Sequence, residues 1–255
     1  MIDTHRRTEA DFHDDLYGNE EKHLERSRLI RAVRRRIVRD FVDRAALTAT
    51  STVLSLGCGD GAIEAMLAPH VGRVVGTDVS AVAVEGARAR ARAGGIRNAE
   101  FVAHDLSTHP LPWGASSFDA VCMFGVLHHI PDAAIPTVLR EARRVVVPGG
   151  TVHSMDPSAR RLVAIFKPLL RRLYQRFHSP GERELDGFAV QRLYREAGFT
   201  GVEIRSSDFF LVPLGFVLPG FPRLLTPVAL ALDAALRRAP VLGARASSFS
   251  IFATS

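Results

Sequence analysis

The feature that most constrains this chain is the segment 53–61, which reads Val-Leu-Ser-Leu-Gly-Cys-Gly-Asp-Gly. An apolar run stops there at three glycines spaced two residues apart, and helix-forming residues follow at once from Ala62 to Leu67. This pattern predicts a buried strand, a tight turn and the start of a helix. Glycine tolerates positive φ and lets a ligand approach the backbone, and a helix start offers unpaired N–H groups. We therefore expect an α/β fold with a ligand-binding loop after its first strand.

This loop differs from two common phosphate-binding loops. The dinucleotide fingerprint G-x-G-x-x-G would need glycine at position 62, where this chain has Ala62. The P-loop would need Gly-Lys-Ser or Gly-Lys-Thr, and neither follows. A glycine turn in some other α/β protein is the plainer alternative for the loop taken alone.

An acid follows the loop at a suitable distance. Asp78 lies 21 residues after Gly57, at the carboxyl end of a second predicted strand. An acid in this position suits a ribose, because one carboxylate can accept hydrogen bonds from both hydroxyls. Asp78 could also cap the helix predicted over 81–93, although Ser80 is the better placed cap.

Two further segments complete a recognisable pattern. Residues 101–106 read Phe-Val-Ala-His-Asp-Leu, and residues 117–132 read Ser-Phe-Asp-Ala-Val-Cys-Met-Phe-Gly-Val-Leu-His-His-Ile-Pro-Asp. In order, spacing and chemistry the four segments resemble the class I S-adenosylmethionine-dependent methyltransferases over roughly residues 50–156. The resemblance is greatest to the small-molecule branch that includes quinone-biosynthesis methyltransferases. From Pro157 onward it is loose.

The resemblance implies S-adenosylmethionine as the cofactor and an acid, Asp105, that faces the adenine amino group. It also implies a Rossmann-like methyltransferase fold: a doubly wound, seven-stranded, mostly parallel sheet with an antiparallel last strand, here with helical inserts. The cofactor-binding residues expected from the motifs are Gly57, Cys58, Gly59, Gly61, Asp78, Val79, His104, Asp105, Leu106 and Phe124.

The order of predicted elements agrees with such a fold, because apolar strands alternate with helices through short connections. A leading helix over 20–44 carries Ile30, Val33, Ile37 and Phe41 on one face. The resemblance implies that residues 1–48 form a helical lid over a methyltransferase domain spanning 49–255. Strands are expected near 52–57, 73–78, 99–104, 118–124, 150–155, 200–208 and 247–254, and helices near 61–70, 80–93, 132–144 and 182–197.

Two inserts, 157–181 and 209–246, depart from the family pattern. The first contains a basic amphipathic stretch over 160–177 that has no acid and is interrupted by Pro168. The second begins with an uncharged stretch over 209–222 whose prolines argue against a regular helix there, and continues with a predicted helix over 228–238. We expect the inserts to cap a hydrophobic or lipid-like substrate or to contact a membrane surface, the alternatives being a homodimer interface or additional core.

Methyl transfer from a sulfonium mainly requires alignment of the reacting atoms and exclusion of water. A hydroxyl or acidic carbon acceptor also benefits from a base poised near neutral pH, which suits His128 or His129 just after the fourth strand. Because the family's Leu-His-His motif occurs with different substrates, a role at the loop or cofactor edge is the alternative. Tyr17, His128 and Asp156 are expected to contact the substrate. No metal-site spacing is recognisable, so we expect metal-free chemistry.

The composition limits the size of the domain and the cellular location that we expect. The 255 residues are 47% hydrophobic, which is enough for one large α/β domain. Two cysteines and a charged start without an apolar leader favour a cytoplasmic protein, which the inserts would place at the inner face of the membrane. The net charge is +6, and nearly all basic residues are arginine.

Other functions were weighed against a small-molecule methyltransferase. An RNA or protein methyltransferase would use the arginine-rich helices for its substrate, but no nucleic-acid module is visible, so nucleic acid is not the favoured partner. A cofactor-binding scaffold without activity is disfavoured by the intact glycines and acids. The family's motifs for exocyclic-amine and cytosine C5 methylation are absent from the sequence.

Overall fold

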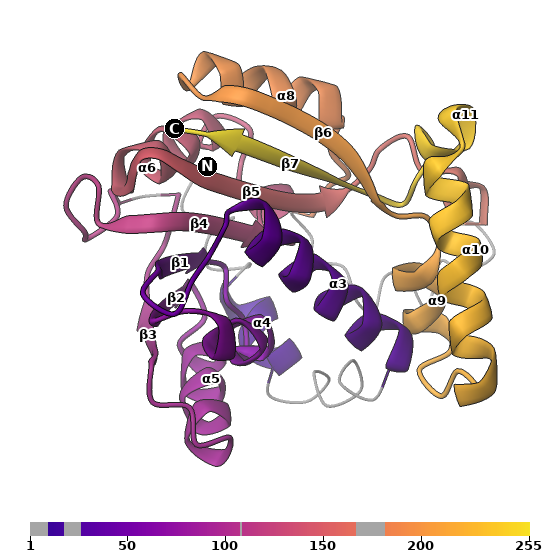
Figure 1. Ribbon diagram of the computed structural model, residues 1–255, viewed down its shortest axis with the longest axis horizontal. Helices are drawn as coiled ribbons and strands as arrows, with labels where there is room; N and C mark the ends of the chain where they lie inside the picture. The colour runs from indigo at the N-terminus through magenta and orange to yellow at the C-terminus, as the bar shows by residue number, and fades with distance from the viewer. Residues whose placement is uncertain (1–9, 18–26, 108, 167–181) are drawn as a thin grey trace.

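The computed structural model describes residues 10–17, 27–107, 109–166 and 182–255. Its centre is a seven-stranded sheet in the order β3-β2-β1-β4-β5-β7-β6 (Figure 1). The first five strands pair in parallel, and β7 is antiparallel to both β5 and β6. The predicted fold class, including the antiparallel last strand, is confirmed. The strands are β1 (Thr52–Leu56), β2 (Arg73–Asp78), β3 (Ala99–Ala103), β4 (Phe118–Phe124), β5 (Val146–Pro157), β6 (Thr200–Asp208) and β7 (Ser248–Thr254).

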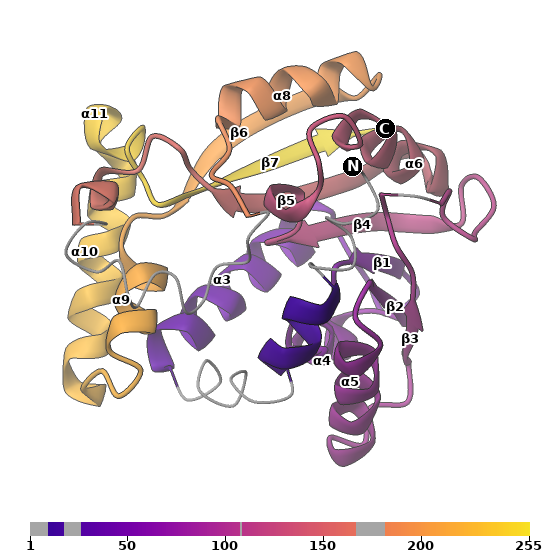
Figure 2. The same cartoon turned by 180° about the vertical axis from the view of Figure 1, so that it is seen from behind.

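Helices cover both faces of the sheet, as the two opposite views show (Figures 1 and 2). Alternation along a strand sends neighbouring side chains to opposite faces, so Val53 packs with α3 and α4 while Leu54 packs with α6 and α8. The helices that flank the sheet are α3 (Arg28–Arg44), α4 (Ala62–Leu67), α5 (Ala81–Ala93), α6 (Ile135–Val145) and α8 (Gly187–Glu196). Short 3-10 turns follow α4 (Ala68–His70) and β4 (Leu127–His129).

Helix α3 is the leading helix that the apolar spacing predicted. Ser27 caps it by accepting a hydrogen bond from the backbone of Ile30, and the expected apolar face is buried. The predicted start at residue 20 lies outside the described residues. α3 packs on α4 at one end and on α9 (Leu211–Val217) at the other, so it crosses one face of the sheet and links the two (Figure 1).

The second insert folds as three helices, α9, α10 (Thr226–Arg238) and α11 (Pro240–Gly243), with a 3-10 turn at Arg223–Leu225. The expectation that prolines exclude a helix between 209 and 222 is wrong for α9. Pro213 is the third residue of that helix, where its missing N–H has no intrahelical partner to lose. The helix ends at Val217, two residues before Pro219.

The first insert is described only in part. β5 runs to Pro157, and a 3-10 helix, η3, covers Leu162–Phe166. Most of the predicted basic amphipathic stretch, from 167 to 177, lies outside the described residues. No helix in the described part of the chain combines the length and the apolar character needed to cross a membrane.

Candidate functional site

A cavity of about 290 Å³ lies at the carboxyl ends of the parallel strands, where ligands bind in doubly wound sheets. One side is made by the loops after β1 to β4, and the other by α3, α9 and the helical residues 10–17. The structure brings most of the predicted site residues together in this lining: Tyr17, Gly57, Cys58, Gly59, Asp78, Val79, His104, Asp105, Leu106, Phe124 and His129. Their individual roles stay predictions.

The glycine loop packs so closely against its neighbours that a side chain would not fit at Gly57 or Gly59. Gly57, Gly59 and Gly61 all have positive φ, at 70°, 52° and 78°. A Cβ added to Gly57 would lie 2.4 Å from a methyl of Val126, and one added to Gly59 would lie 2.4 Å from the Tyr17 hydroxyl. The loop therefore depends on glycine for both its conformation and its close approach to the cavity. Gly61 is not in the cavity lining, because its α-carbon faces Ala87 of α5.

Asp78 is held by the loop that it faces. One carboxylate oxygen accepts a hydrogen bond from the N–H of Gly59 at 2.8 Å, and the other accepts from the N–H of Ser80 at 3.0 Å. Burial raises the pKa of Asp78, and the two N–H donors oppose that shift. Each oxygen retains a second lone pair. The carboxylate can therefore accept hydrogen bonds from two hydroxyls at the cavity wall. The cap of α5 is Ser80, as expected.

Asp105 lies on the far side of Asp78, beyond the end of β3. Its Oδ1 accepts hydrogen bonds from the N–H of Ser107 at 2.8 Å and from the Ser107 hydroxyl at 2.6 Å. The backbone N–H of His104 donates to the carbonyl of Asp78 at 2.8 Å, which joins the two acidic loops. These contacts fix the direction of the Asp105 carboxylate in the cavity wall.

Glu64 is a cavity residue that the sequence analysis missed. It lies in the first turn of α4, is fully buried, and accepts a hydrogen bond from the Ser55 hydroxyl at 2.5 Å. Burial raises its pKa to about 7. Its other oxygen, Oε2, has no hydrogen-bond partner among the described residues. The signal in the sequence was an acid on the buried face of an otherwise apolar short helix, which is expensive to bury unless a ligand pairs with it.

Residues 10–17 cover the cavity from the outside. The Tyr17 hydroxyl lies against Gly59, and the ring of His13 is stacked on Tyr17 at 6.1 Å and packs edge-on against His129 at 4.8 Å. Asp14 accepts a hydrogen bond from the Ser80 hydroxyl. The predicted lid thus contacts the site through a segment that precedes α3. His13, which was not singled out in the sequence, lies in the lining.

His128 and Asp156 form a buried pair behind the lining rather than in it. Asp156 is fully buried, and its Oδ1 lies 2.9 Å from His128 Nδ1 and accepts the backbone N–H of His128 at 3.2 Å. Burial raises the pKa of Asp156 to about 7. Of the two predicted catalytic histidines only His129 reaches the cavity, although the two rings lie 4.0 Å apart.

A cluster that could ligate a cation adjoins this pair. Ligand atoms of His128, His129 and Glu182 all lie within 4.8 Å of one another, with His128 Nε2 at 3.6 Å from a Glu182 oxygen. Two imidazoles and a carboxylate suit a transition metal, and Asp156 would orient His128 for it. Metal-free chemistry stays a prediction.

Comparisons with known proteins agree with this geometry. A family model described as a methyltransferase domain matches residues 53–150. The demethylmenaquinone methyltransferase of Lactococcus lactis is 31% identical over 173 residues, which are 60% of this chain and 67% of that protein. This chain belongs to the class I S-adenosylmethionine-dependent methyltransferases.

Other members of the family match over shorter lengths or by fold alone. An uncharacterized methyltransferase of Mycobacterium tuberculosis is 35% identical over 123 residues, or 47% of this chain, and the chain spans only 59% of that relative's length. A solved methyltransferase from Thermotoga maritima superposes with a TM-score of 0.65 over 96% of this chain and 98% of its own, at 15% identity. At that identity the likeness shows the methyltransferase fold and no more.

Proposed function

We propose that this chain transfers a methyl group from S-adenosylmethionine to an oxygen or carbon of a hydrophobic small molecule. The observation that supports the proposal most is a cavity in which the glycine loop and four acids, Asp60, Glu64, Asp78 and Asp105, face a largely apolar wall from α3 and α9. Family membership supports the cofactor, and the demethylmenaquinone methyltransferase relative supports an acceptor of the quinone kind.

The residues present fit the cofactor. Gly57 and Gly59 line the cavity without side chains, which lets a ligand approach their backbone, and Asp78 offers lone pairs to two ribose hydroxyls. Asp105, held by Ser107 in the cavity wall, would accept a hydrogen bond from the adenine amino group. The unpaired oxygen of buried Glu64 suits the ammonium group at the methionine end of the cofactor. When bound, the cofactor supplies a methyl group that is already activated as a sulfonium.

The acceptor side of the cavity is largely apolar, although Arg34 of α3 also lines it. α3 and α9 present aliphatic and aromatic side chains to it, and Met155 and Phe124 add to the wall from β5 and β4. Such a wall favours a hydrophobic acceptor and keeps water away from the reacting atoms. The apolar residues contributed by α3 and α9 are Ile30, Val33, Ile37, Val212 and Phe216.

If the acceptor must lose a proton, His129 is the better placed of the two histidines, because its ring lies in the cavity lining. The His128–Asp156 pair would then act as a positioning group, since it fixes the loop that carries His129. A substrate contact from Asp156 itself would need the loop to move, because Asp156 is fully buried.

RNA or protein methylation is the second candidate, and the ion pairs of the described residues count against it. Several arginines expected to form a substrate footprint are paired with acids of this chain: Arg36 with Asp233, Arg160 with Asp186, and Arg161 with Glu184. The location of the protein in the cytoplasm and its assembly as a homodimer are separate questions, and both stay predictions.

The test is transfer of labelled methyl from S-adenosylmethionine into a host lysate, followed by separation of organic-soluble and macromolecular fractions. We expect label in the organic fraction, with none from an Asp78→Ala variant, which lacks the ribose contact. Label confined to RNA or protein would replace the proposal with the second candidate, and no transfer into any fraction would leave only cofactor binding.

A further inference from the structure

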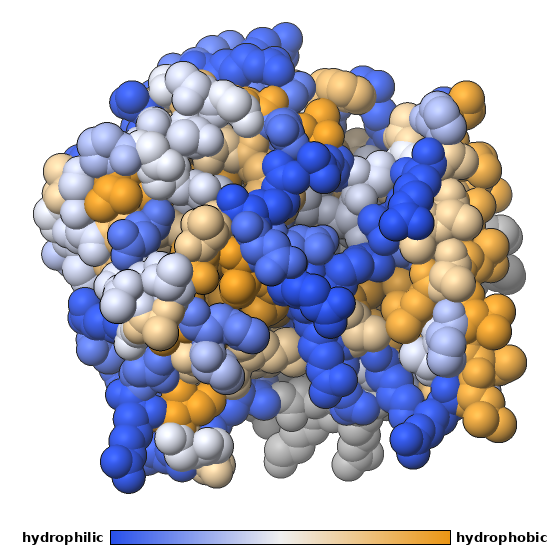
Figure 3. Space-filling view, in the orientation of Figure 1, coloured by the Kyte–Doolittle hydropathy of each residue, from blue (hydrophilic) through white to orange (hydrophobic). Residues whose placement is uncertain are grey.

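We propose that the outer face of α9, α10 and α11 docks on an anionic lipid bilayer. The surface is convex and apolar, and hydrophobic residues gather along this side of the molecule (Figure 3). Leu224 is 90% exposed, Val241 is 81% exposed and Val228 is 63% exposed. We name this surface the α10 face; its exposed apolar residues are Val217, Leu218, Leu224, Leu225, Val228, Leu232, Val241 and Leu242.

α10 has apolar residues on both sides: Ala229 is buried and Leu230 packs against the core, but part of its apolar surface faces outward. Val228 and Leu232 are exposed on its outer side, one turn apart, while Asp233 is fully buried on its inner side. A helix of a globular protein normally buries its apolar stripe and exposes its charges. The exposed stripe therefore needs a partner outside this fold.

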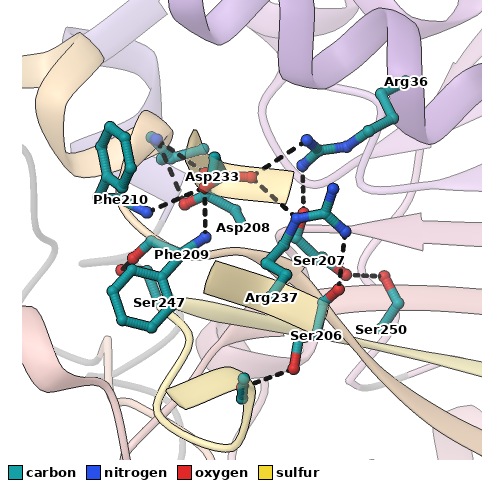
Figure 4. A network of polar contacts seen from close by, with 12 residues as sticks. Arg36, Ser206, Ser207, Asp208, Phe209, Phe210, Asp233, Arg237, Ser247 and Ser250 are labelled. Atoms are coloured by element: carbon teal, nitrogen blue, oxygen red, sulfur yellow. Dashed lines mark hydrogen bonds and ion pairs between the residues drawn. The ribbon is translucent and has the colours of Figure 1, made fainter. Parts of the chain in front are cut away.

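The inner side of α10 is fixed by polar contacts (Figure 4), so the helix cannot rotate to bury Val228 and Leu232. Asp233 accepts hydrogen bonds from the N–H of Phe209 at 2.7 Å and from Arg237 Nε at 2.8 Å, and it pairs with Arg36 of α3 at 3.3 Å. Rotation of the helix would leave a buried charge without these partners, at a large cost in stability.

The charges around the α10 face indicate what covers it. Within 209–246, all of which the structure describes, the only acid is the buried Asp233. Arg223, Arg238 and Arg245 are exposed. Apolar side chains bordered by arginines, with no exposed carboxylate in the segment, complement the acyl region and the phosphates of an anionic bilayer.

A second copy of the chain fits the same surface less well. A two-fold interface brings the same patch of both subunits together. The arginines would then border the same contact from both sides without any acid of this segment to neutralise them, and like charges oppose such a contact.

Docking would also place the bilayer beside the proposed acceptor site. α9 contributes Val212 and Phe216 to the cavity, while Val217 and Leu218 at its end belong to the α10 face. A hydrophobic acceptor could enter along this helix. That route rests on the proposed function, whereas the docking itself does not.

The test is flotation of the purified full chain with phosphatidylcholine vesicles, with and without phosphatidylglycerol, and with no S-adenosylmethionine present. We expect binding to the anionic vesicles that weakens in high salt. A Leu224→Glu/Val228→Glu variant should bind at least about tenfold more weakly. Burying two aliphatic side chains in the bilayer contributes more than the about 1.4 kcal/mol that corresponds to a tenfold change in affinity. Val82→Glu, at an exposed valine of α5, is the matched control and should bind as the parent does.

A second variant, Arg223→Glu/Arg238→Glu, keeps the apolar residues and should lose the preference for anionic vesicles. Absence of vesicle binding at low salt, or binding that neither variant weakens, would overturn the proposal. A dimer in light scattering that becomes monomeric in the Leu224→Glu/Val228→Glu variant would also overturn it and assign the face to a second copy. Since no cofactor is used, either failure leaves the methyl-transfer proposal standing.

Discussion

At the scale of single residues, the site depends on two buried carboxyls with different surroundings. Asp78 receives the backbone N–H groups of Gly59 and Ser80, whereas Glu64 receives the side-chain hydroxyl of Ser55 and leaves Oε2 without a hydrogen-bond partner among the described residues. Burial raises both pKa values, so each carboxylate has a reason to pair with a polar or positive part of a ligand. Substitutions at Asp78 and Glu64 therefore test two separate proposed contacts of the cofactor, the ribose for Asp78 and the ammonium group for Glu64.

Replacing Asp78 by asparagine should weaken binding of S-adenosylmethionine by about tenfold to a hundredfold, because a hydrogen bond to a charged group contributes about 1.5–3 kcal/mol. Isothermal titration calorimetry measures the change, and thermal unfolding reports whether the new amide disturbs the loop. Asp119→Asn is the control, since Asp119 accepts the N–H of Thr52 at the opposite end of these strands. Equal affinities in the parent and Asp78→Asn would contradict the ribose assignment.

Replacing Glu64 by glutamine should change how stability depends on pH. Its folded-state pKa of about 7 exceeds the ordinary value of 4.5, so the native state holds the proton more tightly than the unfolded state. The parent therefore loses stability as pH rises from about 4.5 to about 7, by up to about 3 kcal/mol, and the loss is constant above that range.

The glutamine variant lacks this loss, so its stability relative to the parent should increase through that pH window in urea unfolding without cofactor. Glu85→Gln, at an exposed glutamate of α5 paired with Arg88, serves as the control. A difference between parent and Glu64→Gln that does not vary with pH would show that Glu64 is not buried as a neutral acid.

At the scale of elements, the strand, loop and helix formed by β1, residues 57–61 and α4 constitute the binding unit. Val126, from the loop after β4, closes on Gly57, so the loop is positioned by a second segment as well as by its own turn. The positive φ at Gly57 and the nearby methyl both disfavour a side chain there.

Gly57→Ala should reduce both stability and cofactor affinity, whereas Gly95→Ala should reduce stability only. Gly95 also has positive φ, at 64°, but a Cβ there would meet nothing within 4 Å. Its substitution therefore costs only the conformational strain of about 1 kcal/mol, while Gly57→Ala adds a steric clash. Urea unfolding and calorimetry separate the two effects, and equal losses for the two variants would argue against a special role for the loop.

At the scale of the whole molecule, one polar network joins segments that lie far apart in the sequence (Figure 4). Asp233 of α10 contacts Arg36 of α3, and Arg36 also donates to the carbonyl of Ser207 in β6. Burial raises the pKa of the neighbouring Asp208 to about 7. The network fixes α3, which forms one cavity wall, to the segment that carries the α10 face.

Asp233→Asn should lower the free energy of unfolding by about 3–5 kcal/mol, because it leaves two partly buried guanidinium groups without their carboxylate. Glu203→Gln, which removes an exposed partner of Arg44 and Arg205, should cost about 0.5 kcal/mol or less. Both are measured by urea unfolding. A similar, small effect of the two substitutions would mean that the network does not hold these elements together.

Much of the fold followed from local sequence patterns. The glycine loop, Asp78 and the alternating strands were placed correctly because strand period, turn chemistry and capping depend on neighbours in the chain. Helix α9 was missed because the position of Pro213 within a first turn depends on where the helix starts. The grouping of the predicted cofactor residues in one cavity followed from their shared position at strand ends.

The sequence by itself determined the family, the order of the strands along the chain and the glycine loop that lines the cavity. Only the tertiary structure decided that Ser55 meets Glu64, that His128 lies behind the lining while His129 lies in it, and that α10 exposes Val228 and Leu232. Arg36 and Asp233, for example, are 197 residues apart. Such contacts depend on how whole elements pack, and the local hydrophobic pattern of a sequence does not predict which distant side chains will come into contact.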